Sequence, residues 1–100
     1  MPENAGQQTA APRVTGTEAV AEVVNGIIRR HAWVIPRTVA ITPDLELLEE
    51  GVDSLTLVEI IGSLEKEFNC IFPDDLITLD IFRTPASITS TVIGLLTEAA

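Results

Sequence analysis

The chain has 100 residues, which is enough for one small domain with a single hydrophobic core. Fifteen acidic residues against six basic ones give a formal net charge of -9, which repels the phosphates of nucleic acids and attracts proteins with basic patches. We therefore expect no nucleic-acid binding. We expect no membrane span either, because no apolar run approaches the roughly 18 residues that a span needs.

The single cysteine and the N-terminal residues bear on where the protein is located in the cell. Cys70 is the single cysteine, so no intrachain disulfide is possible, and we expect this side chain to fill a small apolar gap. The N-terminus lacks the basic start and apolar core of a secretory signal. We predict a cytoplasmic monomer, with residues 1–14 as a disordered leader because they show no hydrophobic period, followed by one domain over residues 15–100.

The first predicted helix begins after residues 15–18, which have the spacing of a capping box with Thr15 as the cap. It is expected to end near His31, where basic residues suit the negative end of the helix dipole. Apolar side chains recur at helical spacing and form its expected buried stripe, namely Val20, Val23, Val24, Ile27 and Ile28.

A long loop is predicted over residues 33–50, which contain Pro36 and Pro43 and show no steady period. We expect Trp33 to be an anchor beneath it. The apolar residues of this loop predict that it packs on the helices, through Ile35, Val39, Ile41, Leu45, Leu47 and Leu48.

The second predicted helix runs from Ser54 to about Phe68, with Asn69 as its terminator in the left-handed conformation. Asp53 is a strong N-cap residue, because its carboxylate accepts hydrogen bonds from backbone N–H groups of the first turn. Ser54, at the first helical position, is expected to project toward solvent. The side chains expected to face the core are Leu55, Val58, Ile61, Leu64 and Phe68.

The C-terminal part predicts a short helix and a long one. After a turn at residues 73–75, residues 76–83 are expected to form one or two helical turns packed through Ile77, Ile81 and Phe82. Thr84 and Pro85 predict a third long helix, with a threonine cap and proline at the first helical position. The predicted fold is all-α, a small four-helix bundle of three long helices and one short helix. The last helix is expected to bury Ile88, Val92, Leu95, Leu96 and Ala99.

Three sequence features together resemble the carrier-protein family of acyl carrier proteins and their peptidyl relatives. They are the motif Gly51-x-Asp53-Ser54-Leu55, the amphipathic helix after it, and the Phe-Pro-Asp-Asp sequence at residues 72–75. The resemblance spans residues 18–96 and implies an acyl-carrier-protein-like fold. It implies 4'-phosphopantetheine joined covalently to Ser54, with Asp53 helping to position the metal and the cofactor in the modifying enzyme.

The resemblance also implies a protein that is not an enzyme and that meets several partners. These are a phosphopantetheinyl transferase, an acyl- or aminoacyl-loading enzyme, and a ketosynthase or other pathway enzymes. Partners in this family read the exposed face of the second helix, which is predicted to present Thr56, Leu57, Glu59, Gly62, Ser63 and Lys66. An acyl cargo is expected to lie in a cleft formed by Val58, Ile61, Leu64, Ile77 and Ile81.

Two alternatives stand beside a free-standing acyl carrier of fatty-acid, polyketide or related secondary metabolism. Aspartate before the serine favours an acyl carrier, but some aminoacyl carriers of nonribosomal peptide pathways share it. The other alternative is an unmodified acidic helical adaptor that binds a basic protein.

A catalytic serine is not supported by the sequence. The one histidine, His31, is expected at the far end of another helix, and residues 51–55 lack the order of a hydrolase elbow. The acidic residues follow no metal-ligand spacing, so we predict no metal site.

Overall fold

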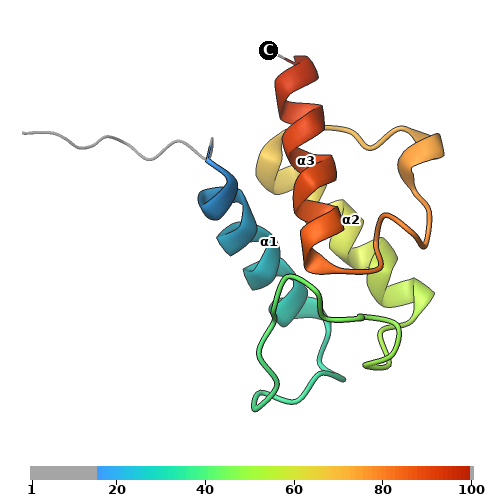
Figure 1. The fold of residues 1–100 in the computed structure, drawn as a ribbon. Helices are drawn as coiled ribbons and strands as arrows, with labels where there is room; N and C mark the ends of the chain where they lie inside the picture. Colours follow the sequence, from blue (N-terminus) through green and yellow to red (C-terminus); the bar gives the residue numbers. More distant parts are fainter. Residues whose placement is uncertain (1–15, 100) are drawn as a thin grey trace, which may run out of the picture.

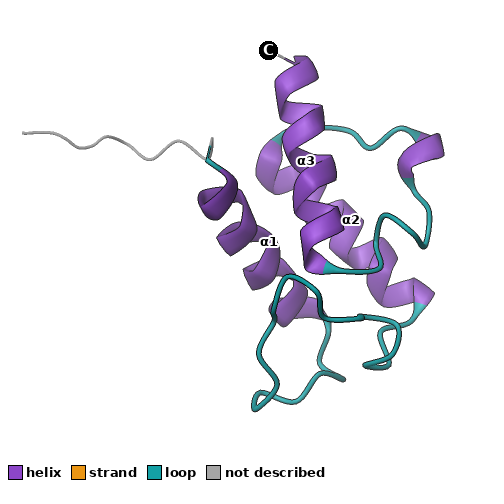
Figure 2. Cartoon of the chain, viewed as in Figure 1, coloured by secondary structure: helices purple, strands orange, loops and turns teal. Residues whose placement is uncertain are grey.

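The computed structural model describes residues 16–99, and these residues form helices and connecting loops without a strand (Figure 2). The helices are α1 (Thr17–His31), α2 (Ser54–Phe68) and α3 (Pro85–Ala99), and a short 3-10 helix, η2 (Asp74–Leu76), lies between α2 and α3 (Figure 1). The all-α prediction is confirmed. The predicted leader, residues 1–14, lies outside the described residues.

The predicted four-helix bundle is not confirmed, because residues 76–83 form no α-helix. Residues 77–83 follow η2 as turns and bends, and only single-turn hydrogen bonds occur there, such as Phe82 N–H to the Thr78 carbonyl at 3.1 Å. A segment this short, with a proline on either side, gains too few hydrogen bonds to offset the cost of starting a helix. Phe82 is nevertheless buried, as predicted.

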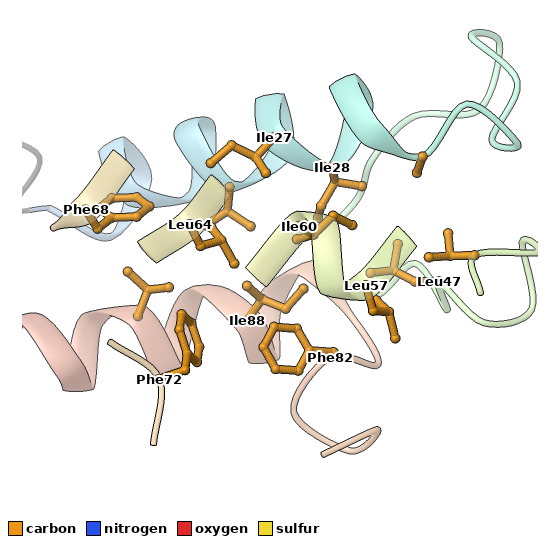
Figure 3. Packing of buried hydrophobic residues seen from close by; sticks show 14 of the residues in the cluster. Ile27, Ile28, Leu47, Leu57, Ile60, Leu64, Phe68, Phe72, Phe82 and Ile88 are labelled. Atoms are coloured by element: carbon orange, nitrogen blue, oxygen red, sulfur yellow. The ribbon is translucent and has the colours of Figure 1, made fainter. Parts of the chain in front are cut away.

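The core lies between the three α-helices, with α1 packed against both α2 and α3 (Figure 3). The predicted stripe of α1 is confirmed, since four of its members are buried and Val23 is partly buried. Ile88 and Val92 of α3 are fully buried, and Leu95 and Leu96 are partly buried. Cys70 packs at the edge of this core, where partial burial and then the nearby Glu65 raise the pKa of its thiol.

The start of α1 differs from the predicted capping box. Gly16 is the N-cap residue, and no side chain caps the helix there. The helix therefore begins one residue later than a cap at Thr15 requires, and Thr15 itself lies outside the described residues.

The long loop crosses the end of the molecule where α1 ends and where α2 and α3 begin (Figure 1). Arg29 fixes its first part by donating hydrogen bonds to the carbonyl oxygens of Ile35, Pro36 and Val39. Ala86 at the start of α3 donates its backbone N–H to the Pro43 carbonyl at 2.9 Å. These hydrogen bonds hold the loop against the end of α1 and the start of α3.

Two residues of the loop contradict the prediction that the loop buries its apolar side chains. Ile35 and Leu47 are buried as expected, but Leu48 is 41% exposed. Trp33 is 87% exposed and is not an anchor beneath the loop. Its indole N–H donates to the Arg30 carbonyl at 2.8 Å, so the ring is held at the end of α1 instead of being packed in the core.

The predicted buried face of α2 is wrong in its first half. Leu55 and Val58 are 70% and 62% exposed, and Ile61 is only partly buried. The α2 helix has apolar residues on most of its circumference, so the helical period fits more than one face. Packing against α1 selects a different stripe, formed by Leu57, Ile60, Leu64 and Phe68.

Candidate functional site

Asp53 caps the start of α2 as predicted. Its Oδ1 accepts a hydrogen bond from the Thr56 backbone N–H at 2.9 Å, and its own backbone is extended, with φ -100° and ψ 177°. This hydrogen bond from the Thr56 backbone lowers the pKa of the Asp53 carboxyl, because it stabilises the charged form. The other end of α2 is also as predicted, with Asn69 in the left-handed conformation at φ 52°.

Ser54 is the first residue of α2 and is exposed to solvent. The N–H groups of a helix's first turn have no partner within the helix, and the helix dipole is positive there. A hydroxyl at this position is accessible to an enzyme, and a phosphate attached to it would lie near those N–H groups.

A small half-open groove of about 180 Å³ begins at Ser54. Three of the predicted cleft residues line it, namely Val58, Ile61 and Ile77. The prediction missed four lining residues, which are Leu57, Thr78, Leu79 and Phe82. The helical turns expected over residues 76–83 were predicted to pack through Ile77, Ile81 and Phe82, so Thr78 and Leu79 were not expected to line the groove.

The other two predicted cleft residues lie elsewhere. Leu64 is fully buried in the core, because it belongs to the stripe that packs between the helices. Ile81 packs against the core as a partly buried residue and does not line the groove. Without a helix over residues 76–83, Ile77 and Ile81 do not share one helical face.

Half of the predicted partner face of α2 is exposed. Glu59, Gly62 and Lys66 are exposed, and Thr56 and Ser63 are partly buried. Leu57 is only 6% exposed and packs in the core.

His31 lies against this face of α2, although it was expected at the far end of another helix. Its Nε2 is 2.7 Å from the Ser63 Oγ, and its Nδ1 is 3.7 Å from the Glu59 Oε1. The arrangement has the residue types of a hydrolytic triad, but the distance to Glu59 exceeds that of a hydrogen bond. Ser63 also lies in the middle of α2, where the backbone N–H groups that would stabilise an oxyanion are used by the helix. We therefore assign His31 a structural role at the contact of α1 with α2.

The described residues show neither a metal site nor a membrane span. Residues 16–98 hold no group of three or more His, Cys, Asp and Glu side chains placed to bind a metal ion. None of the helices described in the structure is long and apolar enough to cross a membrane.

Comparison with protein families decides the identity. Residues 19–92 match the family described as phosphopantetheine attachment site. The chain belongs to this family. It is a phosphopantetheine-binding carrier protein, as the resemblance implied, and such carriers hold covalently attached 4'-phosphopantetheine and are not themselves enzymes. They interact with phosphopantetheinyl transferases and with the enzymes of their pathways.

The start of α2 in this carrier fits the prosthetic group. An exposed hydroxyl stands at the N-terminus of a helix of 15 residues, where a phosphodiester is stabilised by the helix dipole. The groove at the same serine is lined mostly by apolar side chains. The negative charge of Asp53 opposes a phosphate nearby, but its hydrogen bond to Thr56 directs this carboxylate to the backbone.

The capping bond of Asp53 gives the carrier a pH-dependent contribution to stability. The pKa of Asp53 is lowered from 3.8 in the folded state, so the unfolded chain takes up a proton first as the pH falls. The stabilisation is present above this value and is lost as the pH falls through the lower folded-state pKa. We expect Asp53→Ala to reduce the melting temperature at pH 7, and Asp53→Asn, which retains a capping oxygen, to reduce it less.

Thermal unfolding followed by circular dichroism at pH 7 and near pH 2.5 measures this effect. The difference between the wild type and Asp53→Ala should shrink at the lower pH. A melting temperature of Asp53→Ala equal to that of the wild type at pH 7 would show that Asp53 does not act as a cap.

Proposed function

We propose that Ser54 is the residue to which phosphopantetheine is attached. The supporting observation is that Ser54 is the one serine of the chain that is both exposed to solvent and the first residue of a helix. Ser63 contacts His31 in the middle of α2. Ser87 donates its hydroxyl to the Ile81 carbonyl at 2.6 Å, and Ser90 lies inside α3. When bound, the group supplies a thiol that holds the cargo as a thioester.

Intact-mass measurement tests this proposal. After incubation with coenzyme A and a broad-specificity phosphopantetheinyl transferase, the wild type should gain the mass of one phosphopantetheine. Ser54→Ala should gain nothing, because the accepting hydroxyl is absent. Ser90→Ala, which removes an exposed hydroxyl within α3 and away from its first residue, should be modified like the wild type.

Two results would contradict the assignment. One is modification of Ser54→Ala, which would place the group on another residue. The other is an unmodified wild type under conditions that convert a control carrier. Circular dichroism of each variant shows whether the helices are retained.

We further propose that the protein is a free-standing carrier of acyl cargo for fatty-acid, polyketide or related secondary metabolism. The groove supports an acyl cargo, because it begins at Ser54 and its lining is mostly aliphatic and aromatic. Burying an acyl chain there removes apolar surface from water, which stabilises the loaded carrier. An aminoacyl cargo of a nonribosomal peptide pathway is the alternative outcome of the test below.

The expected result is that an acyl chain on the arm perturbs the groove. Loading the wild type from an acyl-coenzyme A of medium chain length should shift the NMR methyl signals of Val58, Ile77 and Leu79, relative to the protein with the unloaded arm. Ile71, which is 78% exposed and does not line the groove, is the internal control. Unchanged groove signals, together with loading by an amino-acid-activating enzyme, would favour the aminoacyl carrier.

The partners proposed for this carrier are a phosphopantetheinyl transferase, a loading enzyme, and a ketosynthase or another pathway enzyme. We propose that they bind the exposed face of α2, where Glu59 supplies an acidic side chain. Leu55 and Val58, which are exposed beside Ser54, add apolar contact area to that face. Cytoplasmic localisation and a monomeric state remain predictions from the sequence.

A further inference from the structure

Basic residues gather at the C-terminal end of α1, although the chain as a whole is strongly acidic. Arg29, Arg30 and Arg37, which are three of the six lysine and arginine residues, line one open hollow of about 630 Å³ together with Trp33. We call it the arginine hollow. Its positive charge contrasts with the formal net charge of -9 on the whole chain.

The three arginines of the hollow differ in their partners. Arg29 donates to carbonyl oxygens of the long loop, so it has a structural role and still contributes its charge. Arg30 and Arg37 are exposed, and neither forms a salt bridge with a carboxylate in residues 16–98. Their guanidinium groups are therefore available to carboxylates of another molecule, which they bind in a two-pronged geometry.

Trp33 adds a fixed apolar group to this surface. The residue is 87% exposed, while its indole N–H is held by the Arg30 carbonyl at 2.8 Å. Val34 beside it is 53% exposed. A large aromatic side chain that is exposed and already held in place loses little conformational freedom on binding, and such residues dominate the energetics of protein interfaces.

This surface reaches the start of α2. A second hollow is lined by Arg30 and Trp33 together with Asp53, Thr56 and Glu59. A molecule seated on Trp33 thus lies next to the capped end of α2. Asp53 and Glu59 place carboxylates in this second hollow, whereas the residues that line the arginine hollow include no acidic side chain.

We propose that Trp33, Arg30 and Arg37 form a docking surface for an acidic segment of a partner protein that carries an apolar side chain. The carboxylates of the segment pair with Arg30 and Arg37, and its apolar side chain packs against Trp33 and Val34. A nucleic acid is the less favoured occupant, because the rest of the chain repels an extended polyanion. Ser54, the proposed attachment residue, does not line either hollow, so binding to the surface does not require the prosthetic group.

The unmodified full chain provides its own reporter, because Trp33 is the single tryptophan. The probe is a synthetic 12-residue peptide in which glutamate alternates with leucine and valine, and the comparison peptide has lysine in place of glutamate. We expect the acidic peptide to shift the fluorescence emission of Trp33 to shorter wavelength in a saturable way. It should also shift the NMR signals of the Trp33 indole N–H and of residues 29–37. The lysine peptide should not.

Charge variants test whether the site is local. Arg30→Glu and Arg37→Glu are each expected to weaken binding of the acidic peptide by about fivefold or more. Lys66→Glu makes the same change in net charge on α2. It should leave the affinity within about twofold, because Lys66 is exposed and lines neither hollow, so solvent and salt screen its charge. Trp33→Ala, followed by NMR, should weaken binding by about tenfold or more.

Several results would overturn the proposal. They are no binding of the acidic peptide at millimolar concentration, equal effects of Lys66→Glu and Arg30→Glu, or tighter binding of a single-stranded oligonucleotide than of the peptide. The Ser54→Ala variant should bind the acidic peptide like the wild type. The outcome is therefore distinguishable from success or failure of phosphopantetheine attachment.

Discussion

Replacing Phe82 with alanine is expected to lower the free energy of unfolding by about 3–5 kcal/mol. The Phe82 ring is 2% exposed and packs against Phe72, with ring centroids 5.5 Å apart. The truncation removes this contact and empties the space that the ring fills in the core and beside the groove at Ser54, which it also lines. Because small domains unfold with a total of about 5–15 kcal/mol, the variant should be close to unfolding at 25 °C.

Urea unfolding followed by circular dichroism measures this loss as a lower midpoint. Phe82→Leu keeps most of the apolar volume and should be less destabilising than the alanine variant. Ile71→Ala is a surface control at a side chain that is 78% exposed, and it should change stability by less than about 0.5 kcal/mol. A midpoint of Phe82→Ala equal to that of Ile71→Ala would contradict the packing described for Phe82.

The second large effect is expected at Leu57, and Leu55 is its matched control. Both substitutions remove the same atoms from the first turn of α2, but Leu57 is 6% exposed and Leu55 is 70% exposed. Leu57→Ala should cost about 2–5 kcal/mol of stability, because it empties a position in the core. Leu55→Ala should change the free energy of unfolding by less than about 0.5 kcal/mol, because this side chain remains in contact with water.

The pair decides which face of α2 packs against the rest of the protein. Urea unfolding of both variants under the same conditions gives the two differences in stability. A larger loss for Leu55→Ala would mean that α2 buries the stripe first predicted from its sequence, with Leu55 and Val58 inside. In the structure Leu55 is instead exposed on the face to which partners are proposed to bind. If that proposal holds, Leu55→Ala should lose partner binding without losing stability.

Features that depend on neighbours a few residues away were predictable from the sequence. The cap formed by Asp53, the start of α2 at Ser54 and the left-handed Asn69 at its end were all predicted. The start of α3 was predicted as well, since the Ser87 backbone N–H donates to the Thr84 hydroxyl at 3.2 Å. These contacts span three or four residues, so the residue types within one turn of helix are sufficient to specify them.

Groups that meet across the fold were not predictable in the same way. The contact of His31 with Ser63 joins residues far apart in the chain. The same holds for the groove, where Leu79 and Phe82 from the loop after η2 meet Val58 of α2. No local pattern encodes these distances, because they depend on how the helices pack and on the path of the loops between them.

The sequence by itself determined where the three long helices lie along the chain and that a capped serine begins the second one, because hydrogen bonds within single turns fix both. Only the tertiary structure decided which apolar stripe of α2 is buried and that Trp33 is left outside the core. Both choices depend on the surface that α1 and the long loop present to the rest of the protein. Several faces of an apolar helix have similar hydrophobicity, and packing against a neighbour selects one of them.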